Sequence, residues 1–83
     1  MPTIVRFDGL RVVVYSNDHR PAHVHVIGNG CEAVFRLDCP DGPPVLRECI
    51  GFRRADVSRP EAELARRLDA LCDGWEAIHG HTH

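Results

Sequence analysis

The feature that most constrains the fold is a pair of two-residue turn signals, Asp8-Gly9 and Asn29-Gly30, each standing between short β-rich runs. A two-residue loop between antiparallel strands needs positive φ at its central positions, which Gly, Asn and Asp tolerate best. The flanking runs are TIVRF (3–7), LRVVVY (10–15), HVHVI (23–27) and CEAVFRLD (31–38). The sequence therefore predicts two β-hairpins, and the nearly continuous apolar character of the second run favours a central strand.

The alternation of apolar and polar residues also predicts the register of the second hairpin. A two-residue loop places Val24 opposite Phe35 on an apolar face, and it places His23 opposite Arg36 on the other face. His25 shares that second face, because alternate residues of a strand point the same way. A slip of one residue would mix apolar and polar side chains on both faces. We therefore expect one buried face and one face that carries histidine and arginine.

The C-terminal part of the chain is predicted to form a single long helix over 59–79. Ser58 and Glu61 fit a capping box, and Pro60 is tolerated in the first turn of a helix. An apolar stripe at helical spacing follows, formed by Leu64, Leu68, Leu71, Trp75 and Ile78. Such a stripe is typical of a helix that covers one face of a sheet.

Between the hairpins and the helix, VLRECI (45–50) predicts a fifth, less regular strand after a rigid turn at 40–44. The expected fold class is α+β: an antiparallel meander of about four to five strands over 3–50, the long helix packed on one face, and a frayed tail at 80–83. With 83 residues and no internal repeat, the chain is expected to form one domain, 1–83.

Charge and apolar content exclude two modes of binding. The formal net charge is −2, and all ten basic residues are Arg, so the chain has no overall electrostatic attraction to nucleic acid or to an anionic membrane. No apolar run approaches the ~20 residues of a membrane span, and the N-terminal residues lack the pattern of a signal peptide. We therefore expect a cytoplasmic protein that makes no contact with a membrane.

The four cysteines, Cys31, Cys39, Cys49 and Cys72, include no C-x-x-C pair, which argues against a zinc ribbon or a thioredoxin-type site. Cys31 continues the apolar alternation of its strand, and Cys72 flanks the helical stripe. Both are interpreted as small buried thiols that stay reduced in a cytosol, and no disulfide is required.

Three of the six histidines lie within NDHRPAHVHV (17–26). Imidazole changes charge near neutral pH and serves as a general acid or base. Cleavage of RNA needs a proton acceptor, a proton donor and a cation that holds the phosphate. The candidates for these catalytic roles are His19, His23, His25, Asp18, Arg36 and Tyr15. In this hypothesis of acid–base phosphodiester cleavage without a cofactor, Asp18 orients an imidazole and Tyr15 reaches in from the end of the adjoining strand.

Three other interpretations stay open. His23 and His25 present both imidazoles to one side of a strand, a geometry used to bind a divalent transition metal such as zinc. His19, Asp18 or Glu32 would complete such a metal site. A second alternative is a non-catalytic module, antitoxin-like or regulatory, that binds a protein partner through an exposed strand edge. The third is purely structural: a turn followed by histidines that face solvent.

The order of these motifs resembles a small bacterial family catalogued as domain of unknown function 4160. The resemblance is carried by a Pro-Thr-Ile start and a Y-x-N-D-H-x-P-x-H-x-H-V core, matched here by Pro2, Thr3, Ile4, Tyr15, Asn17, Asp18, His19, Pro21, His23, His25 and Val26. The chain departs from the family pattern at Ala22 and Val24, where a second proline and a phenylalanine are common. The gene context of the family implies a toxin–antitoxin system and a small cognate protein partner. RNA and a second copy of the chain are the other partners considered.

Overall fold

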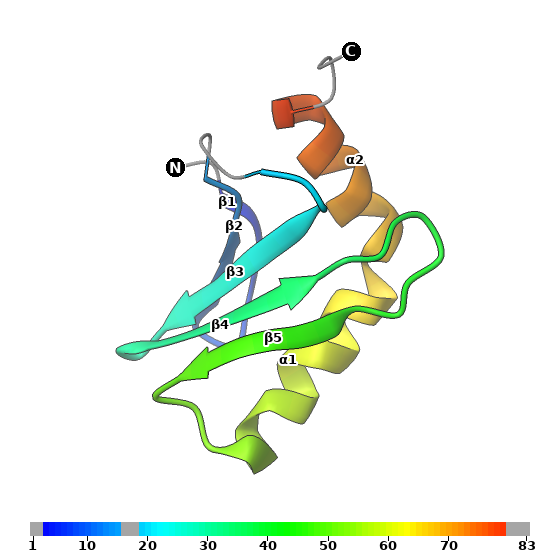
Figure 1. The fold of residues 1–83 in the computed structure, drawn as a ribbon. Helices are drawn as coiled ribbons and strands as arrows, with labels where there is room; N and C mark the ends of the chain where they lie inside the picture. Colours follow the sequence, from blue (N-terminus) through cyan, green and yellow to red (C-terminus); the bar gives the residue numbers. More distant parts are fainter. Residues whose placement is uncertain (1–2, 16–18, 80–83) are drawn as a thin grey trace.

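The computed structural model describes residues 3–15 and 19–79 of the chain. Its elements are, in order, β1 (Thr3–Phe7), β2 (Leu10–Val13), β3 (His23–Gly28), β4 (Cys31–Arg36), β5 (Val45–Ile50), α1 (Arg54–Arg66) and α2 (Leu68–His79). Neighbouring strands pair antiparallel in the order β1-β2-β3-β4-β5, and both helices lie across one face of the sheet (Figure 1). The expected α+β meander is confirmed, with five strands. None of the described helices combines the length and apolar character needed to span a membrane.

Both predicted hairpins form with two-residue loops, and all of the loop residues have positive φ: Asp8, Gly9, Asn29 and Gly30. The second hairpin has the predicted register, with Val24 opposite Phe35 and His23 opposite Arg36. This register sorts the side chains by face. Val24 and Phe35 are fully buried, whereas His23 and Arg36 are half-buried on the other side of the sheet.

The hydrophobic core lies between the sheet and the two helices. Val12, Val26 and Phe35 of the sheet are fully buried in one cluster with Leu64 and Leu71 of the helices. Full burial of a side chain of this size contributes about 1.5–3 kcal/mol relative to leaving it exposed. The opposite face of the sheet, called the open face below, is covered by neither α1 nor α2 (Figure 1). The open face therefore carries neither helix, and its His23 and Arg36 side chains are half-buried.

The C-terminal segment contains two helices, so the prediction of one long helix is wrong. The backbone leaves the helical conformation at Arg67, with φ −111° and ψ 18°, and the Arg67 N–H is shared between the carbonyl oxygens of Glu63 and Leu64. The Arg67 guanidinium also lies 5.8 Å from the centre of the Phe7 ring. A hydrogen bond from its side chain lowers the pKa of Glu63. The apolar stripe stays in phase across the break, which is why the periodicity did not reveal it.

The first helix also begins earlier than predicted, at Arg54. Ser58 and Glu61 therefore lie inside the helix, and the expected capping box is wrong. Pro60 lies inside the helix as well, where its ring removes one backbone donor. The additional turn contributes Val57 to the core, where this residue is only 6% exposed. Burial of that side chain favours the earlier start.

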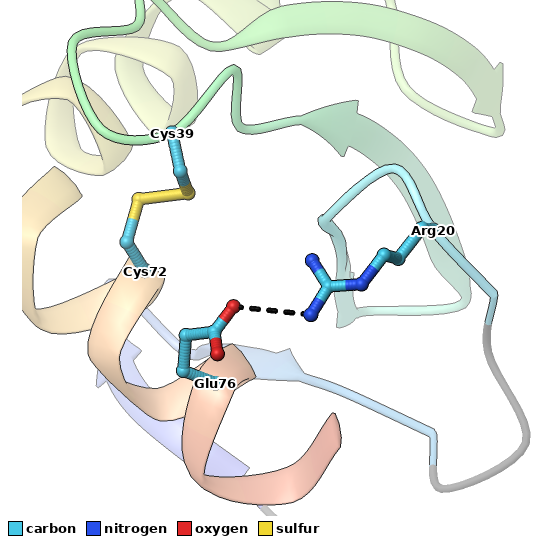
Figure 2. The surroundings of a disulfide bond; sticks show 4 residues. All are labelled: Arg20, Cys39, Cys72 and Glu76. Atoms are coloured by element: carbon cyan, nitrogen blue, oxygen red, sulfur yellow. Dashed lines mark hydrogen bonds and ion pairs between the residues drawn. A yellow bond between two sulfur atoms is a disulfide. The ribbon is translucent and has the colours of Figure 1, made fainter. Parts of the chain in front are cut away.

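A disulfide joins Cys39, in the loop between β4 and β5, to Cys72 of α2 (Figure 2). The interpretation of Cys72 as a reduced thiol is therefore wrong. The two Cα atoms lie 5.9 Å apart in space although 33 residues separate the cysteines in sequence. A pairing of this kind depends on how the helix lies against the loop, which spacing along the chain does not indicate. Cys31, half-buried, and Cys49 carry free thiols.

The second hairpin loop provides a stability test. Gly30 has a φ of 76°, and a Cβ built there would meet open space. Gly30→Ala therefore adds backbone strain without a steric clash, and we expect it to lower the free energy of unfolding by about 1 kcal/mol. Urea unfolding followed by circular dichroism measures the change. A variant as stable as the wild type would contradict the left-handed conformation of this residue.

Candidate functional site

Two imidazoles lie side by side on the open face of the sheet. His23 and His25 both project from β3, and their ring centres are 5.4 Å apart, with an angle of 67° between the ring planes. Arg36 of β4 lies opposite His23. The structure thus brings together three of the candidates selected from sequence. Imidazole and guanidinium groups on one accessible surface are suited to an anionic ligand.

The ring of His23 is held by the segment that precedes β3. Its Nδ1 donates a hydrogen bond to the carbonyl oxygen of Pro21 at 2.8 Å. Because a carbonyl oxygen only accepts hydrogen bonds, the neutral imidazole carries its proton on Nδ1 and its lone pair on Nε2. The backbone at Pro21 therefore selects the tautomer in which Nε2 is the basic atom.

The ring of His25 is held from two sides. Its Nδ1 donates to Oε2 of Glu32 at 3.1 Å, and the ring of Tyr15 packs edge-on with 4.4 Å between centres. Only 13% of the His25 side chain is exposed, so its orientation is well defined. Sequence reasoning named Glu32 only as a metal ligand. The contact between Glu32 and His25 could have been predicted from the hairpin register. That register places Glu32 diagonally across from His25, within reach of a long side chain.

A pocket of about 230 Å³ lies beside these imidazoles and is lined by Pro21, His23, Val34, Arg36 and Arg47. Arg36 is oriented by Asp38, whose carboxylate accepts hydrogen bonds from Nε at 2.6 Å and from Nη2 at 3.4 Å. This two-point contact fixes the plane of the guanidinium. The pocket therefore presents one imidazole and two guanidinium groups to a ligand.

Arg47 was not predicted as a site residue, and the pairing of β5 explains why. Val34 of β4 pairs with Glu48, but the next residue, Phe35, pairs with Leu46. Arg47 is thus the extra residue at an irregularity of the register, as in a β-bulge, and such irregularities redirect side chains. Its side chain lines the pocket. The regular alternation that predicted the faces of β3 and β4 does not indicate a residue placed in this way.

Two of the remaining candidates, His19 and Tyr15, do not line the pocket. Asp18 lies outside the described residues. His19 is exposed and is not part of the pocket lining. Tyr15 contacts His25 but does not line the pocket either. In the described part of the chain, no three His, Cys, Asp or Glu side chains are grouped closely enough to hold a metal ion.

A protein-family model matches most of the chain. Residues 9–76 match the family described as Domain of unknown function (DUF4160). The matched region begins just before β2 and ends within α2, so it includes the imidazole pair, the pocket and both disulfide cysteines. No curated protein and no solved structure matches the chain.

Proposed function

The chain belongs to the DUF4160 family, and we propose that it is a small toxin–antitoxin-type protein that cleaves RNA by acid–base chemistry on its open face. The observation that carries this proposal is the pocket in which His23 lies beside Arg36 and Arg47, with the ring of His25 5.4 Å away. Two adjacent imidazoles supply a proton acceptor and a proton donor, and guanidinium groups bind phosphate in bidentate geometry. The proposed role includes a cytoplasmic location and a small cognate protein partner.

In the proposed reaction, the 2′-oxygen of RNA forms a bond to the adjacent phosphorus while the bond from phosphorus to the 5′-oxygen breaks. His23 accepts the proton of the 2′-hydroxyl at Nε2, because its Nδ1 proton is donated to Pro21. His25 donates a proton to the leaving 5′-oxygen. Arg36 and Arg47 stabilise the negative charge on the phosphate oxygens. The products are a 2′,3′-cyclic phosphate and a 5′-hydroxyl end.

A comparison of RNA and DNA of the same sequence tests this function. The purified protein is incubated with a labelled single-stranded oligonucleotide, with and without a chelator. We expect RNA to be cleaved equally in both conditions, with a 2′,3′-cyclic phosphate end, and DNA to stay intact because it lacks the 2′-hydroxyl. Loss of RNA cleavage on chelation would favour a metal site at His23 and His25. Intact RNA in every condition would refute the enzymatic proposal.

Arg47 provides a prediction about substrate binding. Arg47→Gln is expected to weaken the binding of a single-stranded RNA and to lower the slope of log affinity against log salt concentration by about 0.7, the contribution of one phosphate contact. Fluorescence anisotropy at several salt concentrations measures the slope. The matched control is Arg66→Gln, which removes the same charge from a side chain of α1 that is 71% exposed. Equal slopes for the two variants would contradict a phosphate contact at Arg47.

A second candidate function, binding of a protein partner, is favoured by the edge strand β5. This strand ends the strand order of the sheet, and its Leu46 and Ile50 side chains are 38% and 64% exposed. An edge strand with exposed apolar side chains is a typical docking site for a strand of another chain. We expect the protein encoded beside this chain to co-purify with the wild type and not with Ile50→Lys. Equal co-purification with the wild type and with Ile50→Lys would exclude this edge as the docking site.

A further inference from the structure

Two segments orient the pocket residues, and both are attached to α2 (Figure 2). The first precedes β3. Arg20 Nη2 lies 3.3 Å from Oε2 of Glu76, and the Arg20 guanidinium lies 4.9 Å from the centre of the Trp75 ring. The next residue, Pro21, supplies the carbonyl oxygen that holds His23. Because Pro21 directly follows Arg20, the contacts of Arg20 with α2 help to position the carbonyl oxygen that holds the His23 ring.

The second segment follows β4 and is attached to α2 covalently. Cys39 is bonded to Cys72 of the helix. The residue before it, Asp38, holds Arg36 through both of its carboxylate oxygens. The Arg36 guanidinium is thus held by the residue that directly precedes a covalent anchor.

The two segments are also bonded to each other. Leu37 is fully buried, and its N–H donates to the carbonyl oxygen of Ala22 at 2.9 Å. Leu37 follows Arg36, and Ala22 precedes His23. A displacement of the loop after β4 is therefore transmitted to both sides of the pocket.

We propose that the Cys39–Cys72 disulfide is a redox switch for the site, which is ordered when the bond is oxidised and loosened when the bond is reduced. The inference rests on the proposed function, because it concerns the binding of RNA phosphate by Arg36. With the bond intact, Asp38 is fixed relative to α2. With the bond reduced, the loop at 38–44 keeps only its noncovalent contacts, Asp38 no longer fixes the guanidinium, and RNA is bound less tightly.

The bond is accessible to a small thiol. Cys39 is exposed, and a pocket of about 550 Å³ borders it, lined by Arg20, Pro21, Ala22, Asp38 and Cys39. Arg20 provides a cation for the carboxylate of a thiol such as glutathione. Exposed disulfides are the labile and regulatory ones, and disulfides in cytosolic proteins are usually transient or redox-sensing. The place of this bond on the surface fits a bond that opens and closes.

A carboxylate-bearing thiol is the reductant in the proposed exchange. Its thiolate attacks Sγ of Cys39, the bond between the two protein sulfurs breaks, and Cys72 leaves as a thiolate. A second small thiolate then attacks the sulfur of the small thiol in the mixed disulfide. This step releases Cys39 as a thiolate and forms the disulfide of the reductant. Two electrons pass to the protein, and the two protons of the small thiols end on the two cysteines. Oxidation reverses these steps.

Contacts other than this bond also hold α2 to the rest of the fold. Leu68, Leu71 and Trp75 attach α2 to the core. Reduction is therefore expected to leave the sheet and the helices in place and to loosen the loop at 38–44. This separation makes the bond suitable as a local switch.

Amide hydrogen exchange at Leu37 tests the switch directly. The oxidised protein is compared with protein treated with an excess of reduced glutathione and with the double variant C39S/C72S. We expect glutathione to open the bond. In both proteins that lack the bond, we expect the Leu37 amide to exchange about tenfold faster, because its hydrogen bond to the Ala22 carbonyl oxygen is weakened. The affinity for a single-stranded RNA should fall by a similar factor, and reoxidation should restore both values in the wild type. The matched control C49S keeps the disulfide and should behave as the wild type.

Three results would overturn the proposal. The first is a bond that resists excess glutathione, and the second is unchanged Leu37 exchange after reduction. The third is faster exchange at Leu37 with unchanged affinity for RNA, which would refute the coupling between the loop and the site. Failure of the proposed function gives a different pattern, because the oxidised wild type would then neither bind nor cleave RNA while Leu37 exchange still responds to glutathione. In that pattern reduction of the bond loosens the loop, and regulation of RNA binding is refuted together with the function.

Discussion

Replacement of His23 by alanine is expected to lower the rate of RNA cleavage by about 10²- to 10⁴-fold, the typical contribution of a positioned general base. His23 lines the pocket together with Arg36 and Arg47, and its hydrogen bond to Pro21 leaves the lone pair of the neutral ring on Nε2. Alanine removes this base but keeps the strand, because His23 lies on the open face and is not part of the core cluster. Single-turnover cleavage rates, with the melting temperature measured in parallel, check this expectation.

Three further histidine variants make the comparison informative. His25→Ala removes the proposed proton donor, so we expect a similar decrease, and the double variant should lose little more than either single variant because the two groups act as a unit. His19 is exposed and does not line the pocket, so His19→Ala should keep most of the activity. A His23→Ala variant with the wild-type rate and an unchanged melting temperature would refute the assignment of the general base.

The hairpins and the place of His23 in the site were predictable because the information that determines them is local. The loop at Asn29-Gly30 requires positive φ, and these two residues tolerate it. Once the loop length is known, only one register buries Val24 and Phe35 on the same face. The same register brings His23 to the open face. Local propensity and pairing pattern agree here, and no distant contact is needed to choose between alternatives.

The features that sequence reasoning missed depend on contacts between distant parts of the chain. The break at Arg67 keeps the apolar stripe in phase, so the periodicity gives no sign of it. Cys39 and Cys72 meet only because α2 lies against the loop after β4. Arg47 reaches the pocket through an irregular register on an edge strand. Each of these features is decided by tertiary packing, which a single sequence does not report at the level of individual residues.

Trp75→Ala is expected to cause the largest loss of stability among single substitutions, about 3–5 kcal/mol. Trp75 is 1% exposed and belongs to the core cluster. Its ring also stacks on His79, with 4.3 Å between centres, and lies below the guanidinium of Arg20. Alanine would leave a cavity that the surrounding side chains fill only in part. Because a folded domain has a total stability of about 5–15 kcal/mol, urea unfolding followed by circular dichroism should show a large shift of the midpoint.

Trp75→Phe separates the packing of this ring from its polar atom. The indole Nε1 is buried and has no hydrogen-bond partner among the described residues, and a buried donor without a partner is unfavourable. Phenylalanine removes that donor together with part of the ring volume, so the two effects oppose each other and the expected loss is less than about 1.5 kcal/mol. A loss as large as that of Trp75→Ala would contradict an unpartnered Nε1. Arg20 attaches the segment that holds His23 to this ring. Trp75→Ala should therefore also reduce RNA cleavage under conditions where the variant is still folded. Trp75→Phe keeps an aromatic face for the Arg20 guanidinium and should retain RNA cleavage.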